Sequence, residues 1–150
     1  MNRTSIRLPL VIAGWLAVLI THSATAQKTA PESTSTTLAG VYTDDQAARG
    51  QKIYGMSCLG GCHNNASHKG PNFKQNWSGH PLSELFERIK DTMPDDNPGL
   101  LSATESIDVV SYLLKANGIP AGKTELAADK PALAKIKIEL PPSGGGSPNR

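Results

Sequence analysis

The sequence predicts an all-α fold of three to four helices, and three observations lead to this prediction. Three segments carry apolar residues at helical spacing, and residues that begin or end helices flank each of them. No pair of runs with alternating apolar and polar residues competes with these segments. Between the polar ends of the 150-residue chain, residues 41–140 leave room for one small domain.

The first expected helix runs from Asp44 to about Met56. Thr43 and Gln46 have the spacing of a capping box, which favours a helix that begins at this point. We expect the helix to end just before Cys58, with Met56 in the core. Its other apolar positions are Ala47, Ile53 and Tyr54.

The second expected helix begins after Pro81 and stops before Pro94, so that it ends at Met93. The residues between the first two helices are expected to form a loop, because glycine and proline interrupt them. The apolar positions of the second helix follow the pattern i, i+3, i+4 and i+7, and they are Leu82, Leu85, Phe86 and Ile89.

The third expected helix begins at a capping box, Ser102-x-x-Glu105, and ends at Asn117-Gly118 with Pro120 beyond it. We expect this helix to pack across the first. A further helical turn is expected from Asp129 to about Lys135. The apolar positions of the third helix are Ile107, Val110, Leu113 and Leu114, and those expected to fold back after it as a lid are Leu133, Ile136 and Ile138.

The first 26 residues have the pattern of a cleavable signal peptide. Arg3 and Arg7 precede an apolar run of about 13 residues, and Ala24-x-Ala26 is a small-residue cleavage site. The run is short of the roughly 20 residues that a spanning helix needs, so an uncleaved anchor is the weaker alternative. The pattern predicts export to the periplasm, with no stable membrane insertion after cleavage.

Polar, low-complexity residues flank the expected domain. Residues 27–40 are expected to be a flexible linker and residues 141–150 a disordered tail. Removal of Arg3 and Arg7 with the leader lowers the 15 Lys and Arg to 13, which equals the 13 Asp and Glu. A balanced charge does not favour nucleic acid or an acidic lipid surface as a partner.

Two thiols and an imidazole stand together in the segment Cys58-Leu59-Gly60-Gly61-Cys62-His63. Covalent haem is usually attached at Cys-x-x-Cys-His, where both cysteines form thioethers and the histidine binds iron. Here three residues separate the cysteines. Gly60 and Gly61 reach positive φ at little cost and let the backbone bulge while both sulfurs face one porphyrin edge. The segment predicts one covalently bound haem c with its iron.

Two other interpretations of the same residues stay open. A disulfide between Cys58 and Cys62, the two cysteines in the chain, would close a loop too small to stabilise the fold by much. A zinc ion would find three ligands in these two cysteines and His63, and no nearby sequence pattern adds a fourth.

Several further segments resemble class I cytochrome c, and this resemblance spans most of the expected domain. The segments are Ala48 to Tyr54, Gly70-Pro71, Trp77-x-Gly79 and Thr92-Met93-Pro94. More narrowly, Leu85 to Pro94 and Val109 to Gly118 look like the small cytochromes found with, or fused to, quinoprotein alcohol dehydrogenases of bacteria.

The resemblance implies a class I cytochrome c fold, with the helices wrapped around one haem, and a role for each site residue. Cys58 and Cys62 would hold the haem, and His63 and Met93 would be its proximal and distal iron ligands. The Pro71 carbonyl would accept the second N–H of the proximal imidazole. Trp77 would pack near the haem edge and propionates.

Other residues are weaker candidates for the same site. Tyr54, Phe73 and Phe86 are possible pocket lining in a chain with few aromatic residues. His68 and His80 are expected to be solvated loop histidines.

With both axial positions filled, the expected function is electron carriage and not catalysis. The expected partners are a dehydrogenase donor and an oxidase or another cytochrome as acceptor. The alternatives are a haem enzyme or ligand-binding cytochrome with an open distal position, and a redox-inert subunit held by a disulfide.

Overall fold

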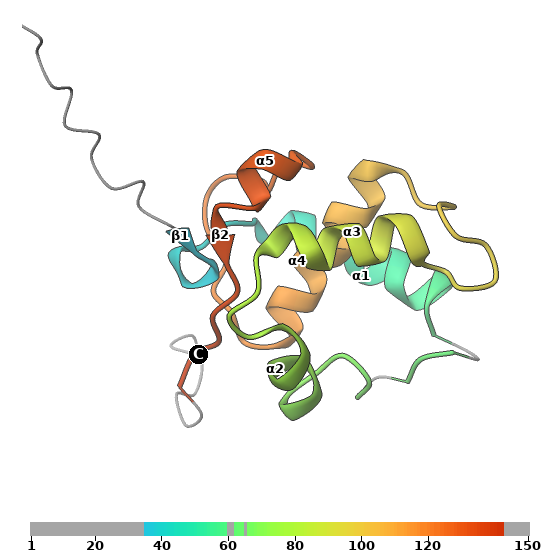
Figure 1. The fold of residues 1–150 in the computed structure, drawn as a ribbon, viewed down its shortest axis with the longest axis horizontal. Coiled ribbons are helices and arrows are strands. Elements are labelled where there is room, and N and C mark those ends of the chain that lie inside the picture. Colours follow the sequence, from blue (N-terminus) through green and yellow to red (C-terminus); the bar gives the residue numbers. More distant parts are fainter. Residues whose placement is uncertain (1–34, 60–61, 65, 143–150) are drawn as a thin grey trace, which may run out of the picture. The chain divides into compact units, whose positions relative to one another are not determined.

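The computed structural model describes residues 35–59, 62–64 and 66–142. The expected signal peptide, linker residues 27–34, Gly60, Gly61 and tail residues 143–150 lie outside the described residues. The prediction of an all-α fold is confirmed, because the described residues form five α-helices, one 3-10 helix and a single pair of two-residue strands (Figure 1). In chain order they are β1 (Ser35–Thr36), η1 (Thr37–Ala39), α1 (Asp44–Ser57), α2 (Pro71–Trp77), α3 (Leu82–Thr92), α4 (Ala103–Ala116), α5 (Lys130–Leu133) and β2 (Ile136–Lys137).

The three helices predicted from periodicity are α1, α3 and α4, and their ends agree with the predicted caps. Ser102 begins α4 with both halves of a capping box, because its hydroxyl accepts from the Glu105 N–H and the Glu105 carboxylate accepts from the Ser102 N–H. Gly118, with φ of 74°, follows the last turn of α4. All eight apolar positions predicted for α3 and α4 are buried.

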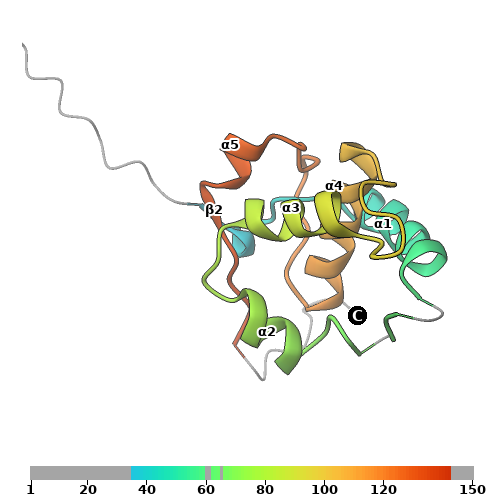
Figure 2. The same cartoon turned by 45° about the vertical axis from the view of Figure 1, so that its right-hand side comes forward.

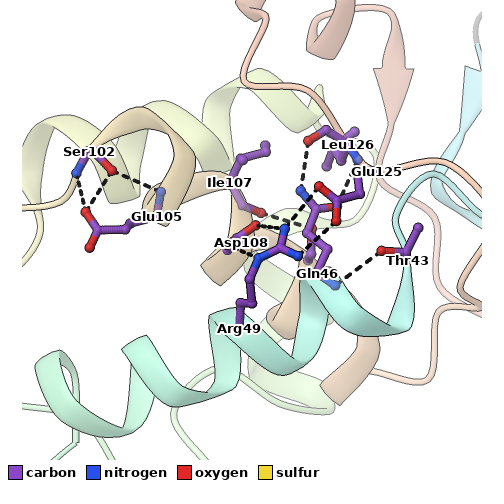
Figure 3. Close-up of polar contacts among 10 residues, drawn as sticks. Thr43, Gln46, Arg49, Ser102, Glu105, Ile107, Asp108, Glu125 and Leu126 are labelled. Atoms are coloured by element: carbon purple, nitrogen blue, oxygen red, sulfur yellow. Dashed lines mark hydrogen bonds and ion pairs between the residues drawn. The ribbon is translucent and has the colours of Figure 1, made fainter.

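Helix α1 begins at Thr43, but half of the predicted capping box is absent. The Thr43 hydroxyl accepts from the Gln46 N–H at 3.2 Å, as expected. The Gln46 side chain does not return to Thr43. It is buried and pairs with the Leu126 backbone, donating to the carbonyl and accepting from the N–H at 2.8 Å each (Figure 3). The buried backbone at Leu126 needs both partners, and this need outweighs the local cap.

Helix α4 packs across α1 as predicted, and the contact is closest at Gly50. A Cβ atom at Gly50 would lie 1.8 Å from the carbonyl oxygen of Asp108 on α4. Only glycine lets two helix backbones approach to this distance.

Residues 35–40, the last six of the expected linker, form β1 and η1 and the glycine that ends η1. Ser35 and Thr36 form β1, which pairs in parallel with β2. Thr37 is fully buried, and its hydroxyl donates to the Glu139 carbonyl at 2.7 Å and accepts from the Glu139 N–H at 2.9 Å. The pairing partners lie about a hundred positions later in the chain, so local composition could not reveal them.

The expected lid at the C-terminal end is present. Leu133 and Ile138 are fully buried, and Ile136 is partly buried in β2. Two backbone hydrogen bonds, from Ile138 N–H to the His80 carbonyl and from Gly79 N–H to the Ile138 carbonyl, fasten this segment to the connection between α2 and α3.

Two local expectations about the α1 region are wrong. Met56 is 77% exposed and is not a core residue, because it lies on the face of α1 that points away from α4 and the core. The stretch between α1 and α3 is not entirely a loop, because residues 71–77 form α2, which lies at the lower edge of the molecule in both views (Figure 2).

Candidate functional site

A cavity of about 530 Å³ collects five of the six residues that were predicted to bind the cofactor. They reach it from separate parts of the chain: the end of α1 and the loop after it, the end of α2, and the end of α3. The five are Cys58, Cys62, His63, Trp77 and Met93.

Pro71 is the predicted residue that the structure does not bring to the cavity. It occupies the first turn of α2, where a proline is readily accommodated, and it is exposed. It is absent from the residues that line the cavity. Its contact with the imidazole of His63 stays a prediction.

The two thiols differ in their surroundings. Cys58 caps the C-terminus of α1 and is half-buried, and burial raises the pKa of its thiol. Cys62 is exposed, and both cysteines are free. Leu59 and His63 form an isolated parallel bridge. Both sulfur-bearing residues line the same cavity in spite of the longer spacer.

Met93 enters the cavity at the point where α3 stops. Its N–H donates to the Ile89 carbonyl at 3.1 Å as the last bond of the helix, while its own backbone is extended, with φ of −121° and ψ of 148°. Pro94 follows directly and favours this extended conformation. The thioether is half-buried and is therefore available to a group inside the cavity.

Most of the cavity wall is apolar, and its charged groups are exposed side chains. Arg88 on α3 and the Asp95-Asp96 pair after Met93 are the charged residues of the lining. Tyr54 and Trp77 are aromatic lining residues as predicted, whereas Phe73 and Phe86 belong to the core and not to the cavity. The aliphatic residues of the wall are Leu59, Leu85, Ile89, Val109 and Leu113.

His68 is a component of the site that the sequence did not reveal. It is half-buried and lines the cavity, which corrects the expectation of a solvated histidine. Its ring lies 4.3 Å from the His63 ring between centroids, at 60°, and its Nδ1 is 3.0 Å from the Tyr54 hydroxyl. Burial, and then the neighbouring His63 imidazole, lower the pKa of His68 below its usual value.

The other histidine behaves as expected. His80 is exposed, its Nδ1 lies 2.7 Å from Glu84 Oε2, and it does not line the cavity. For His68, the available signal was indirect. Tyr54 and Cys58 stand four residues apart on α1 and so share one face, which marks Tyr54 as a residue of the site but does not identify its partner.

The residues of this cavity fit a haem c group. Two free thiols and an imidazole from one loop, a thioether from another segment and a largely apolar wall are the donor set and the surroundings that such a group requires. The cavity volume is within the usual range for cofactor sites. In the part of the chain that the structure describes, no three His, Cys, Asp or Glu side chains are placed together to hold a bare metal ion.

Comparison with known proteins agrees with this assignment. Residues 45–113 match the model of the family described as cytochrome C oxidase, cbb3-type, subunit III. The match extends from α1 into α4 and includes both cysteines, His63 and Met93. Neither the curated proteins nor the solved structures contain a match to the chain. The matched segment is similar to a cytochrome c domain, and the mostly helical architecture is consistent with the cytochrome c fold.

Proposed function

We propose that this chain is a periplasmic mono-haem c-type cytochrome that carries single electrons between a dehydrogenase and a downstream acceptor. One observation carries the proposal: two thiols, an imidazole and a thioether from separate chain segments line a single apolar cavity. The family match over residues 45–113 supports the haem-binding and electron-carrying part of the proposal.

Each of the four residues has a distinct role in this proposal. The Cys58 and Cys62 sulfurs would form thioethers with the cofactor, and the His63 imidazole and the Met93 thioether would bind its iron. Haem c supplies an iron centre that gains and loses one electron. Because two side chains of the chain itself would bind the iron, a substrate would have to displace one of them, and carriage is favoured over catalysis.

The surroundings of the cavity suit a carrier that meets its partners briefly. Leu85, Ile89 and Val109 keep water from the cofactor side of the helices. The exposed Arg88, Asp95 and Asp96 lie at the same cavity and are of mixed sign, which favours weak, salt-sensitive encounters over a permanent complex.

The compartment and the partners belong to the same proposal. The leader pattern in residues 1–26 supports export, and covalent haem attachment is expected on the outer side of a bacterial inner membrane. The segments that look like cytochromes of quinoprotein alcohol dehydrogenases favour such an enzyme as donor, with an oxidase or another cytochrome as acceptor. Among the described residues, no helix combines the length and the apolar character required to span a bilayer.

The test is to express the full chain in a host with a haem-attachment system and to measure its intact mass and its visible and near-infrared spectra. We expect the mass of one haem and a low-spin spectrum with the charge-transfer band of a methionine–iron bond. Met93→Leu should abolish that band. Met56→Leu is the matched control, because Met56 is exposed and lies outside the cavity.

Three results would contradict the proposal. A colourless protein, or one that loses all its pigment to acidified organic solvent, would exclude covalent haem. Strong carbon monoxide binding by the native, reduced wild-type protein would indicate an open distal position and hence the ligand-binding alternative. An unchanged near-infrared band in Met93→Leu would assign the distal ligand to another residue.

A further inference from the structure

We propose that His68, held in place by Tyr54 and Asn117, is the positioning residue that fixes the orientation of the His63 imidazole. This inference rests on the proposed function, because it concerns how an axial ligand is oriented.

The first observation is the contact between the two imidazoles. The His63 and His68 rings are 4.3 Å apart between centroids and inclined by 60°, which is an edge-to-face contact. A ring packed in this way cannot rotate about its χ2 angle without displacing its neighbour. The orientation of His68 therefore restricts the orientation of His63.

The second observation is that His68 is itself held from two helices. Its ring is hydrogen-bonded through Nδ1 to the Tyr54 hydroxyl of α1 at 3.0 Å. Its backbone carbonyl accepts from the Asn117 side chain, at the end of α4, at 2.9 Å. Asn117 also accepts from the Gly70 N–H at 2.8 Å, so the loop is fastened on both sides of Lys69.

The third observation concerns what else could orient His63. Within the described residues, no side-chain hydrogen bond to its ring is found. An axial histidine normally depends on a neighbouring group to set its ring orientation. Of the groups that the structure places around His63, the His68 ring is the one in ring contact with it and anchored to the helices.

The physical consequence is electronic. The plane of an axial imidazole determines how its π orbitals overlap with the iron d orbitals, and hence the spread of the ferric EPR g values and of the haem-methyl NMR shifts. A loss of stability alone leaves these signals in place, because they report ring orientation in the folded protein. They therefore separate a positioning role from a merely structural one.

The experiment compares ferric holoprotein of the wild type with His68→Ala, His68→Phe and Tyr54→Phe. The matched control is His80→Ala, which removes an exposed imidazole that lies outside the cavity. We expect the haem to remain attached and low-spin in every variant. His68→Ala should shift the g values and broaden or multiply the haem-methyl resonances, and Tyr54→Phe should do so to a smaller extent. His68→Phe, which keeps a ring in place, should be closer to the wild type than His68→Ala, and the control should be unchanged.

The outcomes that overturn the inference differ from those that overturn the proposed function. If the EPR and NMR spectra of His68→Ala and Tyr54→Phe are both the same as those of the wild type, His68 does not position His63. The same conclusion follows if His80→Ala shifts these signals equally. If His68→Ala loses the low-spin spectrum, His68 is an iron ligand and not a positioning residue. In each of these cases the wild type still carries haem, whereas a haem-free wild type overturns the proposed function and the inference together. Should His68→Ala fail to fold, Tyr54→Phe, which keeps the aromatic ring, decides the matter by the same spectra.

Discussion

Gly50 has no side chain, and this allows α1 and α4 to pack against each other next to the site. The α1–α4 crossing at this residue leaves no room for a methyl group next to the Asp108 carbonyl. The obstacle is helix backbone, which cannot turn aside as a flexible side chain could. Since α1 carries Tyr54 and ends at Cys58, and α4 carries Val109 and Leu113, the crossing also sets the width of the cavity.

We predict that Gly50→Ala destabilises the protein by about 3 kcal/mol or more, at the upper end of the cost of overpacking, because the two helices must separate. Gly55→Ala in the same helix is the control, since a Cβ atom there meets nothing within 4 Å. The control should be neutral or more stable by roughly 0.5–1 kcal/mol. Urea unfolding of the two holoprotein variants measures both values, and equal stabilities would contradict the close approach.

At the same crossing, Arg49 shows how one side chain can join three elements. Its guanidinium binds the buried Asp108 carboxylate of α4 in a two-point contact at 2.9 and 3.0 Å (Figure 3). It also binds Glu125, in the segment after α4, at 2.9 and 3.1 Å. Planar two-point pairing of this kind is specific to arginine.

At the scale of elements, Arg49 and Gln46 together join the segment of Glu125 and Leu126 to α1. The hydrogen bond to Arg49 lowers the pKa of the Glu125 carboxyl below its usual value. A lowered pKa in the folded state stabilises the protein at pH values above the unfolded pKa, and this stabilisation is lost as the pH falls through the folded value.

We therefore predict that Glu125→Gln is less stable than the wild type at pH 7 and that the difference disappears in acid, below the usual pKa range of a glutamate. Thermal unfolding of both proteins across this pH range provides the measurement. Glu84→Gln, on α3 and away from Arg49, is a control for the general effect of removing an exposed carboxylate. If the difference in stability between Glu125→Gln and the wild type did not change with pH, the charge on Glu125 would not be the cause of that difference.

The helices themselves divide into those that local sequence could predict and one that it could not. Helices α1, α3 and α4 have caps and an apolar face, and both signals act within the helix, so periodicity located them to within a residue or two. Helix α2 has seven residues, begins at Pro71 after a left-handed Gly70, and buries Phe73 alone. So short a helix depends on tertiary contacts and leaves little periodic signal.

The candidate site shows the same division. Cys58, Cys62, His63 and Met93 could be predicted, because their roles follow from residue type and spacing along the chain. His68 could not, because its inward orientation depends on Tyr54 and Asn117, which come from two different helices. The exposure of Met56 was missed for a related reason, since only the packing of α1 decides which of its faces is covered.

At the scale of the whole molecule, Thr37 closes the folded unit. Its hydroxyl exchanges two hydrogen bonds with the backbone of Glu139, 102 residues away, beside the parallel pair of β1 and β2. The contact is part-buried, so the backbone groups of Glu139 have little access to water as an alternative partner.

We predict that Thr37→Val, which keeps the side-chain shape, destabilises the protein by about 1–3 kcal/mol because it leaves two backbone groups of Glu139 unpaired. Thr36→Val in β1 is the neighbouring control, and β-branched valine suits a strand position. Hydrogen exchange at the Glu139 and Ile138 amides measures the local effect. If hydrogen exchange at these amides were unchanged in Thr37→Val, the predicted loss of stability at Glu139 would be wrong.

The pairing of Ser35 with Ile136 has a consequence for how the unit can be joined to other proteins. Because the pair is parallel, the chain enters β1 and leaves β2 at opposite ends of this small sheet, so proteins fused before β1 and after β2 would be attached at opposite ends of it. The two fusions would therefore present the cavity to the attached protein in different orientations.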